Sequence, residues 1–284
     1  MAVAAKLASS LSLSRPTASY ERLERGLIWA FVGTIAFSLA GTALLRLFPS
    51  LMGVFGPIYP WLVKSPTWTY MALMPVISIA LYGRSLGWAN MGFFFAWGSL
   101  IGGISELVGT TTGIPFGNYV YTEWLGVKLL DHVPYFIPAS WFAMSIICYD
   151  LAYRLTDTPW GRIIVASVFM VLWDFSLDPA MNRAFPFWVY PDGGFLYGMP
   201  ASNWAGWLAV SLVIMWGYEF IGGGLPKLHR LAPMVFFLNC LFPLGISLLY
   251  GLHAAVLLGV FATAIPLLAV WGRSRDKHPF ALRP

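Results

Sequence analysis

The sequence predicts an all-α integral membrane protein: a bundle of about eight transmembrane helices, with seven as the alternative. Of its 284 residues, 58% are hydrophobic, 17% are aromatic and only 10% are charged, and the mean hydropathy is +0.71. Soluble domains contain roughly 45–50% apolar and about 25% charged residues. A chain of this length allows about eight spans of roughly 20 residues each, which leaves little for an extramembrane domain. We therefore expect one membrane domain.

The apolar runs define the elements in order. We expect a cytoplasmic tail over residues 1–26, a single helical membrane domain over 27–271 and a second cytoplasmic tail over 272–284. The predicted spans are 27–48, 67–83, 88–108, 133–153, 163–181 and 203–221, followed by a two-helix hairpin over 231–271 that turns near Gly251. Polar loops are expected at 109–132 and 182–202.

Prolines shape two of these elements. The segment 51–63 is apolar but short and is broken by Pro57 and Pro60, which favours an interfacial or re-entrant piece. The fourth span is expected to open with Pro134 and Pro138, which a first helical turn tolerates because its backbone donors have no helical partners.

Basic residues are distributed unevenly about these spans. One side receives 13 of the 17 Lys and Arg residues, and the other receives Arg46, Lys64, Lys128 and Arg183. Because cytoplasmic loops carry the excess of positive charge, both termini are expected to be cytoplasmic. The basic residues lie at segment ends without interleaved aromatics, so the net charge of +5 does not indicate nucleic-acid binding. The two cysteines fall inside apolar runs and predict no disulfide.

Acidic residues are concentrated in the stretches 102–138 and 171–182. The predicted topology brings five polar residues to one side of the bilayer: Glu106, Asp131, Asp174, Asp178 and Asn203. The two aspartates are four residues apart and share a helix face, which Asn182 is expected to continue one turn later. Solvation at the membrane interface is one explanation. An ionisable group inside apolar helix is costly, however, and marks a functional site by default.

Carboxyl groups held close together in a poorly solvated site supply one acid and one base, because their pKa values are pushed apart. We expect Asp174 or Glu106 to be the acid, since they lie deepest, and Asp178 or Asp131 to be the base, nearer the water. Residues expected to bind substrate or position water are Asn118, Tyr119, Tyr121, His132, Trp173, Asn182 and Asn203. The asparagines are alternatively helix caps.

Aromatic residues in the polar loops offer a second chemical function. Tyr119, Tyr121, Trp124, Trp173, Tyr190 and Trp204 present ring faces that would stabilise a carbocation by cation–π attraction, or would serve as interfacial anchors. His132 is the only histidine beside the acidic cluster, so the sequence predicts no histidine-rich metal centre. It also lacks nucleophile-elbow, Walker and dinucleotide-binding motifs. We therefore expect no metal and no cofactor.

The stretches PFGNYVYTEWLGVKLLDHVPYFIPASWF (115–142) and WDFSLDP (173–179) resemble the membrane carotenoid-biosynthesis proteins that include the carotenoid 1,2-hydratases. Members are called γ-carotene 1'-hydroxylase or bisanhydrobacterioruberin hydratase, and the resemblance covers about residues 88–207. It implies cofactor-independent addition of water to the terminal C1=C2 double bond of an acyclic end group, of lycopene or γ-carotene type, giving a tertiary 1-hydroxy carotenoid.

The resemblance also implies the surroundings of the protein. These are a bacterial cell membrane, an acyclic or monocyclic carotenoid substrate, the lipid bilayer and other carotenoid-pathway enzymes, with no nucleic acid. It supplies no catalytic residue assignments, so the roles given above rest on the chemistry of the residues.

Two other functions stay open. The Asp-x3-Asp pair in DFSLD is of the kind that holds magnesium on a diphosphate in an intramembrane prenyltransferase or elongase, with Glu106 and Asp131 as a second acidic motif. Magnesium dependence would distinguish that function. A small proton-coupled transporter would relay protons through buried carboxylates; we find none of its usual internal repeats in the sequence, although the proline-broken segment 51–63 is compatible with it.

Overall fold

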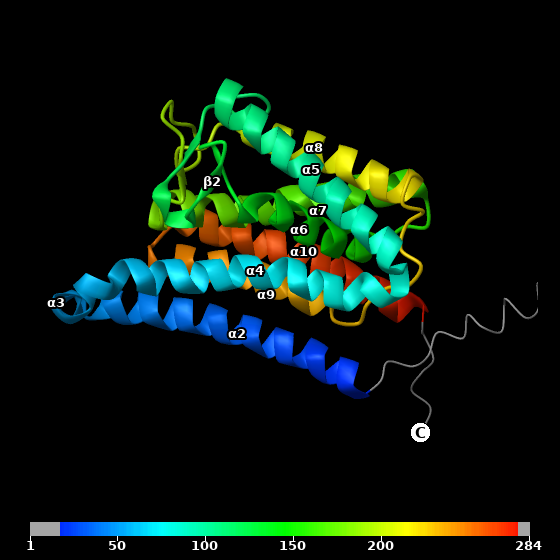
Figure 1. Ribbon diagram of the computed structural model, residues 1–284, viewed down its shortest axis with the longest axis horizontal. Helices are drawn as coiled ribbons and strands as arrows, with labels where there is room; N and C mark the ends of the chain where they lie inside the picture. The colour runs from blue at the N-terminus through cyan, green and yellow to red at the C-terminus, as the bar shows by residue number, and fades with distance from the viewer. Residues whose placement is uncertain (1–17, 278–284) are drawn as a thin grey trace, which may run out of the picture.

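The computed structural model describes residues 18–277, with side chains up to Arg273, and is almost entirely helical (Figure 1). Eight helices in this part of the chain have 18 or more residues: α2 (Ala18–Leu47), α4 (Tyr59–Leu86), α5 (Trp88–Thr112), α6 (Phe136–Tyr153), α7 (Pro159–Pro179), α8 (Ala201–Phe220), α9 (Ala232–Leu249) and α10 (His253–Lys277). Six of them, all except α4 and α8, are long and apolar enough to cross a membrane. The predicted all-α membrane protein is confirmed.

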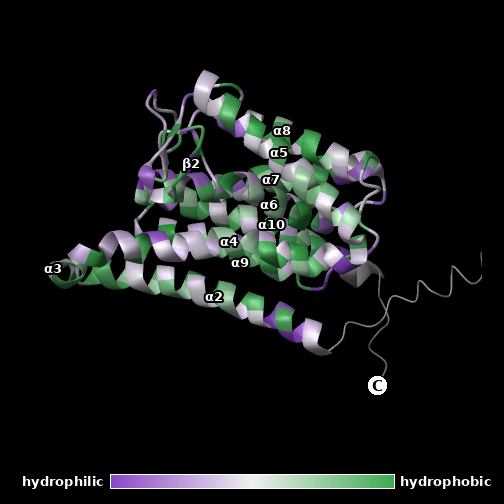
Figure 2. Ribbon diagram, viewed as in Figure 1, coloured by the Kyte–Doolittle hydropathy of each residue, from purple (hydrophilic) through white to green (hydrophobic). Residues whose placement is uncertain are grey.

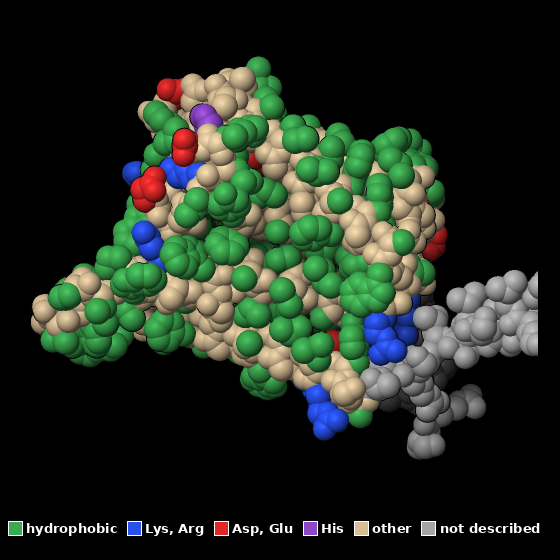
Figure 3. Space-filling view, viewed as in Figure 1, with side chains coloured by type: hydrophobic (Ala, Val, Ile, Leu, Met, Phe, Trp, Pro, Cys, Tyr) green, Lys and Arg blue, Asp and Glu red, His purple; other side chains and the backbone are tan. Residues whose placement is uncertain are grey.

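The helices form one bundle, and the described chain begins and ends at the same end of it (Figure 1). Polar residues collect at helix ends and in the loops, whereas the middle parts of the helices are mostly hydrophobic (Figure 2). The surface shows the same division, because hydrophobic side chains cover its middle and most charged side chains in this view lie toward the ends (Figure 3). This is the distribution that a bilayer requires of a spanning bundle.

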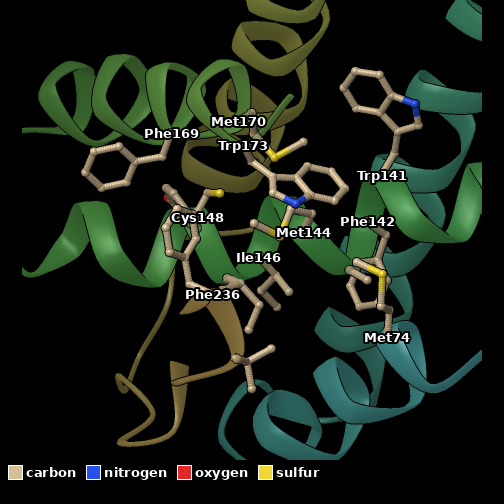
Figure 4. Packing of buried hydrophobic residues seen from close by; sticks show 14 of the residues in the cluster. Met74, Trp141, Phe142, Met144, Ile146, Cys148, Phe169, Met170, Trp173 and Phe236 are labelled. Atoms are coloured by element: carbon tan, nitrogen blue, oxygen red, sulfur yellow. The ribbon is translucent and has the colours of Figure 1, made fainter. Parts of the chain in front are cut away.

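Helix α6 lies at the centre of the bundle. Of its 18 residues, 14 are buried, because it contacts α4, α5, α7, α8 and α9. Figure 4 shows part of the resulting core, with Phe142 and Met144 from α6 and Met170 and Trp173 from α7. Helices in a bilayer associate through such close side-chain packing, since lipid supplies little hydrophobic driving force between them. The core thereby fixes the ends of α5 and α7, which carry the acidic residues.

The two polar loops are joined by a small antiparallel sheet. Strand β1 (Val120–Tyr121) pairs with β4 (Trp188–Val189), with Val120 opposite Val189 and Tyr121 opposite Trp188. A short helix, η3 (Glu123–Leu125), follows β1, and a hairpin then pairs β2 (Lys128–Leu129) with β3 (Val133–Pro134). The pairing of β1 with β4 holds both loops over the C-terminal ends of α5 and α7.

The segment around residue 60 is more helical than predicted. Helix α4 begins at Tyr59 rather than at residue 67, because Pro60 lies in its first turn, where a missing backbone N–H has no cost. The expected interfacial segment 51–63 is therefore divided among η1 (Pro49–Leu51), α3 (Met52–Phe55), η2 (Gly56–Ile58) and the start of α4. Helix α3 and its flanking turns join the ends of α2 and α4, which run side by side (Figure 1).

Helix α7 continues as the π-helix η4 (Ala180–Ala184). Pro179 has no N–H to donate to the helix, and Phe185 N–H bonds to the Ala180 carbonyl, five residues back, at 3.2 Å. The wider turn rotates the side chains that follow it. The prediction that Asn182 continues the face of Asp174 and Asp178 is therefore wrong, and its amide instead donates to the Tyr197 carbonyl at 2.8 Å.

Other boundaries shift by smaller amounts. Helix α2 begins at Ala18 rather than at residue 27, and residues 1–17 and 278–284 of the two predicted tails lie outside the described residues. Pro134 lies in β3 rather than in the first turn of α6, which begins at Phe136. The predicted hairpin of two helices is confirmed, with a turn at Gly251 that has a φ of 68°.

Candidate active site

A cavity of about 80 Å³ lies where the polar ends of α5 and α7 meet the loop sheet. Glu106, Asp178 and Asn203 line it. The rest of its wall is mainly aromatic: Tyr70, Phe116, Tyr119, Tyr121, Trp141, Trp173, Trp188, Tyr190, Trp207 and Phe242. An apolar cavity with a few convergent polar groups is the form expected of a binding site for a small apolar group.

Glu106 projects into this cavity from α5 and is only 5% exposed. Its Oε1 accepts a hydrogen bond from Trp141 Nε1 at 2.9 Å, and its Oε2 accepts from the hydroxyls of Tyr119 and, at 2.8 Å, of Tyr121. All three donors are neutral. A carboxylate that accepts several hydrogen bonds is stabilised in its ionised form without a cation.

Two glycines on the same face of α5 make room for these donors. Gly102 and Gly109 lie four residues before and three residues after Glu106. A Cβ on Gly102 would collide with the ring of Trp141, and a Cβ on Gly109 would lie 2.7 Å from the ring of Phe116. The glycines therefore allow the aromatic side chains to approach the helix backbone beside the carboxylate.

Asp174 and Asp178 form a buried pair on α7, 0% and 3% exposed. One amide nitrogen, Asn203 Nδ2 from α8, donates to Oδ2 of Asp174 at 2.8 Å and to Oδ2 of Asp178 at 2.6 Å. Asp178 also accepts from Trp188 Nε1 at 2.6 Å and from the Tyr190 hydroxyl at 3.0 Å. Oδ1 of Asp174 has no hydrogen-bond partner among the described residues. Two carboxyl groups held this close cannot both be ionised easily, so the pair is suited to hold one proton.

The loop sheet explains how the neutral donors reach the carboxyl groups. Successive side chains of a strand alternate between its faces, so Tyr119 and Tyr121 share one face, as do Trp188 and Tyr190. Burial, followed by the nearby Glu106 carboxylate, raises the pKa of Tyr119 and Tyr121 well above the ordinary value. Burial and the charge of Asp178 raise the pKa of Tyr190 in the same direction. The phenols therefore remain hydrogen-bond donors across the whole working range of pH.

Three indole rings line the cavity. Trp141 and Trp207 are stacked with ring centroids 4.1 Å apart, and Trp173 meets Trp207 edge-on at 5.9 Å. Trp173 also donates its Nε1 proton to the Asn239 carbonyl at 3.2 Å, which fixes its orientation. Indole faces attract cations, so this wall can stabilise positive charge in the cavity.

Four other predicted site residues do not line the cavity. Asp131 is exposed in the β2–β3 turn with a φ of 61°, and His132 beside it is half-buried. Asn118 is exposed and donates to Asp192 Oδ2 at 2.6 Å, so it ties the two loops together. Asn182 contributes to loop structure in the same way, as described above. Glu106, Asp174, Asp178 and Asn203 therefore lie together at the cavity, whereas Asp131 lies in a loop at the same end of the bundle but outside the cavity lining.

The aromatic assignments divide similarly. Tyr119, Tyr121, Trp173 and Tyr190 line the cavity, as described above. Trp124 instead packs against Tyr59, and Trp204 against Phe175.

Sequence reasoning missed other aromatic residues of the cavity, chiefly Trp141, Trp188 and Trp207. The alternation in Trp188-x-Tyr190, which repeats that in Tyr119-x-Tyr121, was the available signal for Trp188. Trp141 and Trp207 lie within predicted apolar spans, and nothing in the sequence distinguished them from other span residues.

The donor set does not resemble a metal centre. Among residues 18–277, no group of three or more His, Cys, Asp or Glu side chains is arranged to hold a metal ion. Both Asp174 and Asp178 face the same amide nitrogen of Asn203, a hydrogen-bond donor. Of the second acidic motif expected for a magnesium-diphosphate site, Glu106 lines the cavity and Asp131 lies outside it.

Comparison with known proteins places the chain in a family. A profile of the family described as carotenoid biosynthesis protein matches residues 67–266, more than half of the chain and a range that includes every residue lining the cavity. Bisanhydrobacterioruberin hydratase from Haloarcula japonica is 33% identical over 136 residues, which cover 46% of this chain and 46% of that protein. The chain thus aligns with less than half the length of this relative. No solved structure matches the chain significantly. The chain belongs to the family of carotenoid biosynthesis proteins.

Proposed function

We propose that the protein is a carotenoid 1,2-hydratase, which adds water to the terminal C1=C2 double bond of an acyclic carotenoid end group of lycopene or γ-carotene type. The observation that carries the proposal is that two buried carboxyl groups line one largely aromatic cavity: Glu106 on α5, and Asp178, paired with Asp174, on α7. Family membership and the relative's name, a hydratase, support it.

The aspartate pair is the proton donor in this proposal. It holds one proton between two carboxyl groups that share the Asn203 amide. Asp178 lines the cavity, whereas Asp174 does not. We therefore reverse the roles expected from the sequence: Asp178 delivers the proton to C2 of the substrate, Asp174 shares the charge left behind, and Glu106 is the base. Protonation of C2 breaks the π bond and leaves a tertiary cation at C1.

The indole rings and Glu106 complete the reaction. The faces of Trp141, Trp173 and Trp207 stabilise the cation at C1. Water then forms a C–O bond to C1 and loses a proton to Glu106, whose carboxylate is held by Trp141, Tyr119 and Tyr121. The product is a tertiary alcohol, with one hydrogen added at C2 and one hydroxyl at C1.

One proton must return from Glu106 to the aspartate pair before the next turnover. Tyr119 bonds to Glu106 and Tyr190 bonds to Asp178, and their rings lie 5.8 Å apart. These two phenols are our candidates for the return path, with water between them. Exchange of both sites with solvent would serve the same purpose.

Isotope labelling tests the proposal. The chain is expressed in a bacterium that accumulates lycopene or γ-carotene, the culture is grown in water enriched in oxygen-18, and the pigments are analysed by mass spectrometry. We expect a new hydroxycarotenoid that carries the heavy oxygen. Oxygen derived from dioxygen would make the protein a hydroxylase, and a product longer by an isoprene unit would make it a prenyltransferase. Unchanged pigment in cells that contain folded protein would contradict the proposal.

A further inference from the structure

The catalytic cavity is too small for a whole carotenoid. Its volume of about 80 Å³ is below that of an engineered cavity of about 150 Å³ that binds one benzene molecule. It therefore has room for no more than the reacting end group. The remainder of a long polyene has to lie in an adjoining space, which the structure allows us to search for.

A larger apolar groove, of about 400 Å³, adjoins the cavity. It runs between α2, α3, the start of α4 and the end of α9, and its lining includes Phe37, Gly41 and Phe55. Thr67 and Phe242 line both the groove and the cavity, so these two side chains lie between the two spaces. This shared wall with the cavity distinguishes the groove from an ordinary surface depression.

The groove is chemically suited to a hydrocarbon chain. Most of its lining residues are aliphatic or aromatic, and its one charged side chain, Arg46, lies over the ring of Tyr250 at 4.4 Å. Several apolar side chains at its mouth remain open to the surroundings: Phe37 is 53% exposed and Leu44 is 43% exposed. A hydrocarbon chain in the groove would pack against these side chains.

A third hollow extends the path to the outer surface of the bundle. It lies between α2 and α4, and it shares Phe37 and Pro66 with the groove. Small residues form much of its floor, including Ala30, Gly33 and Ser65. The three spaces thus form one series, from the outer surface of α2 and α4 to the carboxyl groups.

We propose that the groove between α2, α4 and α9 is the binding site for the polyene chain of the substrate, and that the substrate enters from the bilayer between α2 and α4. This inference rests on the proposed function for the identity of the occupant. The end group passes Thr67 and Phe242 to reach Glu106 and Asp178. The chain behind it lies in the groove, with its far end toward the hollow at Gly33.

Gly41 offers a way to fill the groove without distorting the protein. A Cβ on Gly41 would meet no other atom within 4 Å, so the side chain of Gly41→Leu would extend into empty space. Gly26 lies on the same helix, also has open space around it and does not line the groove. Gly26→Leu is therefore the matched control, because it makes the same chemical change on the same helix.

The test measures binding separately from catalysis. Purified wild type, Gly41→Leu and Gly26→Leu are titrated with lycopene in detergent micelles, and binding is followed by quenching of tryptophan fluorescence by the polyene. We expect Gly41→Leu to bind lycopene at least about tenfold more weakly, since its side chain takes volume from the polyene. Gly26→Leu is expected to bind as the wild type does.

The possible results are distinguishable. Equal lycopene affinity in wild type and Gly41→Leu would overturn the inference, and so would equal weakening in the Gly26→Leu control. Native mass spectrometry tests the alternative that the groove holds a phospholipid. If the wild type binds a phospholipid that Gly41→Leu does not, and both bind lycopene equally well, the groove is a lipid site and the inference is overturned. Groove-dependent binding of lycopene without any hydrated product would support the binding site and contradict the proposed reaction alone.

Discussion

Buried carboxyl groups occur at both ends of the bundle, and the two ends hold them differently. At the cavity end, Glu106, Asp174 and Asp178 accept hydrogen bonds from phenol, indole and amide donors. At the opposite end, Asp150 pairs with Arg154 at 2.8 Å, and Glu219 pairs with Arg162. A neighbouring cation stabilises the ionised form of a carboxylate, whereas neutral donors supply no opposite charge. We therefore expect the ion pairs to contribute to stability, and the carboxyl groups at the cavity end to carry out the proposed chemistry.

The largest effect is expected at the cavity end. Asp178→Asn keeps the size of the side chain but removes the proton that reaches C2, so we expect hydration to fall by about 10³-fold or more. Turnover of lycopene by purified protein measures this, and thermal unfolding verifies that the variant is folded. Turnover within a few-fold of the wild type would show that this carboxyl group is not the acid.

The opposite end should respond in stability instead. Arg162→Met leaves the Glu219 carboxylate, whose side chain is 7% exposed, without its cation. We expect the free energy of unfolding to fall by about 3 kcal/mol, near the lower limit for breaking a buried pair, because the Tyr149 hydroxyl still donates to Glu219. Chemical denaturation in detergent measures the loss. The rate of lycopene hydration per folded molecule should not change. A tenfold slower rate would contradict the assignment of catalysis to the cavity end alone.

A change beside Glu106 should have an intermediate effect on catalysis. Gly102→Ala places a methyl group against the ring of Trp141, which must move away from Oε1 of Glu106. We expect turnover to fall about tenfold, because the water-activating carboxylate loses one of its three donors and its position. Gly92→Ala, on the same helix with open space around it, is the control. Equal activities of the two variants would contradict the role of Trp141.

The end of the bundle opposite the cavity should also make stability depend on pH. Burial, followed by the charges of Arg230 and Lys227, lowers the pKa of His229 to about 4 from an ordinary value of 6.5. Below pH 6.5 the unfolded chain binds a proton there that the folded chain does not, so stability is retained above about pH 6.5 and lost as the pH falls toward 4. Thermal unfolding of the wild type and His229→Gln between pH 4 and pH 8 should show a shallower loss in the variant. Identical profiles would contradict this.

The smallest effect is expected at Asp131. This residue is exposed in the turn between β2 and β3, away from the cavity lining. Asp131→Asn should leave turnover within about twofold of the wild type, as surface substitutions away from special features usually do. A loss comparable to that of Asp178→Asn would restore Asp131 as a candidate for the base, one of the two that the sequence suggested.

The contrast between Asp131 and the other acidic residues shows how far sequence reasoning extends. Glu106, Asp174, Asp178 and Asn203 lie on helices, so the order of spans alone brought them to one side of the bilayer. Asp131 lies in a hairpin turn, where it and Leu130 have φ values of 61° and 49°, and both residues are exposed. Span order does not determine the conformation of a loop.

The missed features all depend on pairing between distant segments. Trp188 and Tyr190 reach Asp178 because β4 pairs with β1, a contact that no local pattern encodes. Trp141 reaches Glu106 because Gly102 admits it across the interface of α5 and α6. Proline positions were ambiguous for a similar reason, since Pro60 is tolerated in a first turn whereas Pro179 leads into a π-helix.

The most direct test of the central claim follows the proton. Purified protein is supplied with unlabelled lycopene in deuterium oxide, and the hydroxylated product is analysed by nuclear magnetic resonance and mass spectrometry. If the aspartate pair delivers a solvent-derived proton, the product carries one deuterium at C2, beside the new hydroxyl at C1, and Asp178→Asn yields little of it. A hydroxylated product without deuterium at C2 would contradict acid-catalysed hydration by these carboxyl groups.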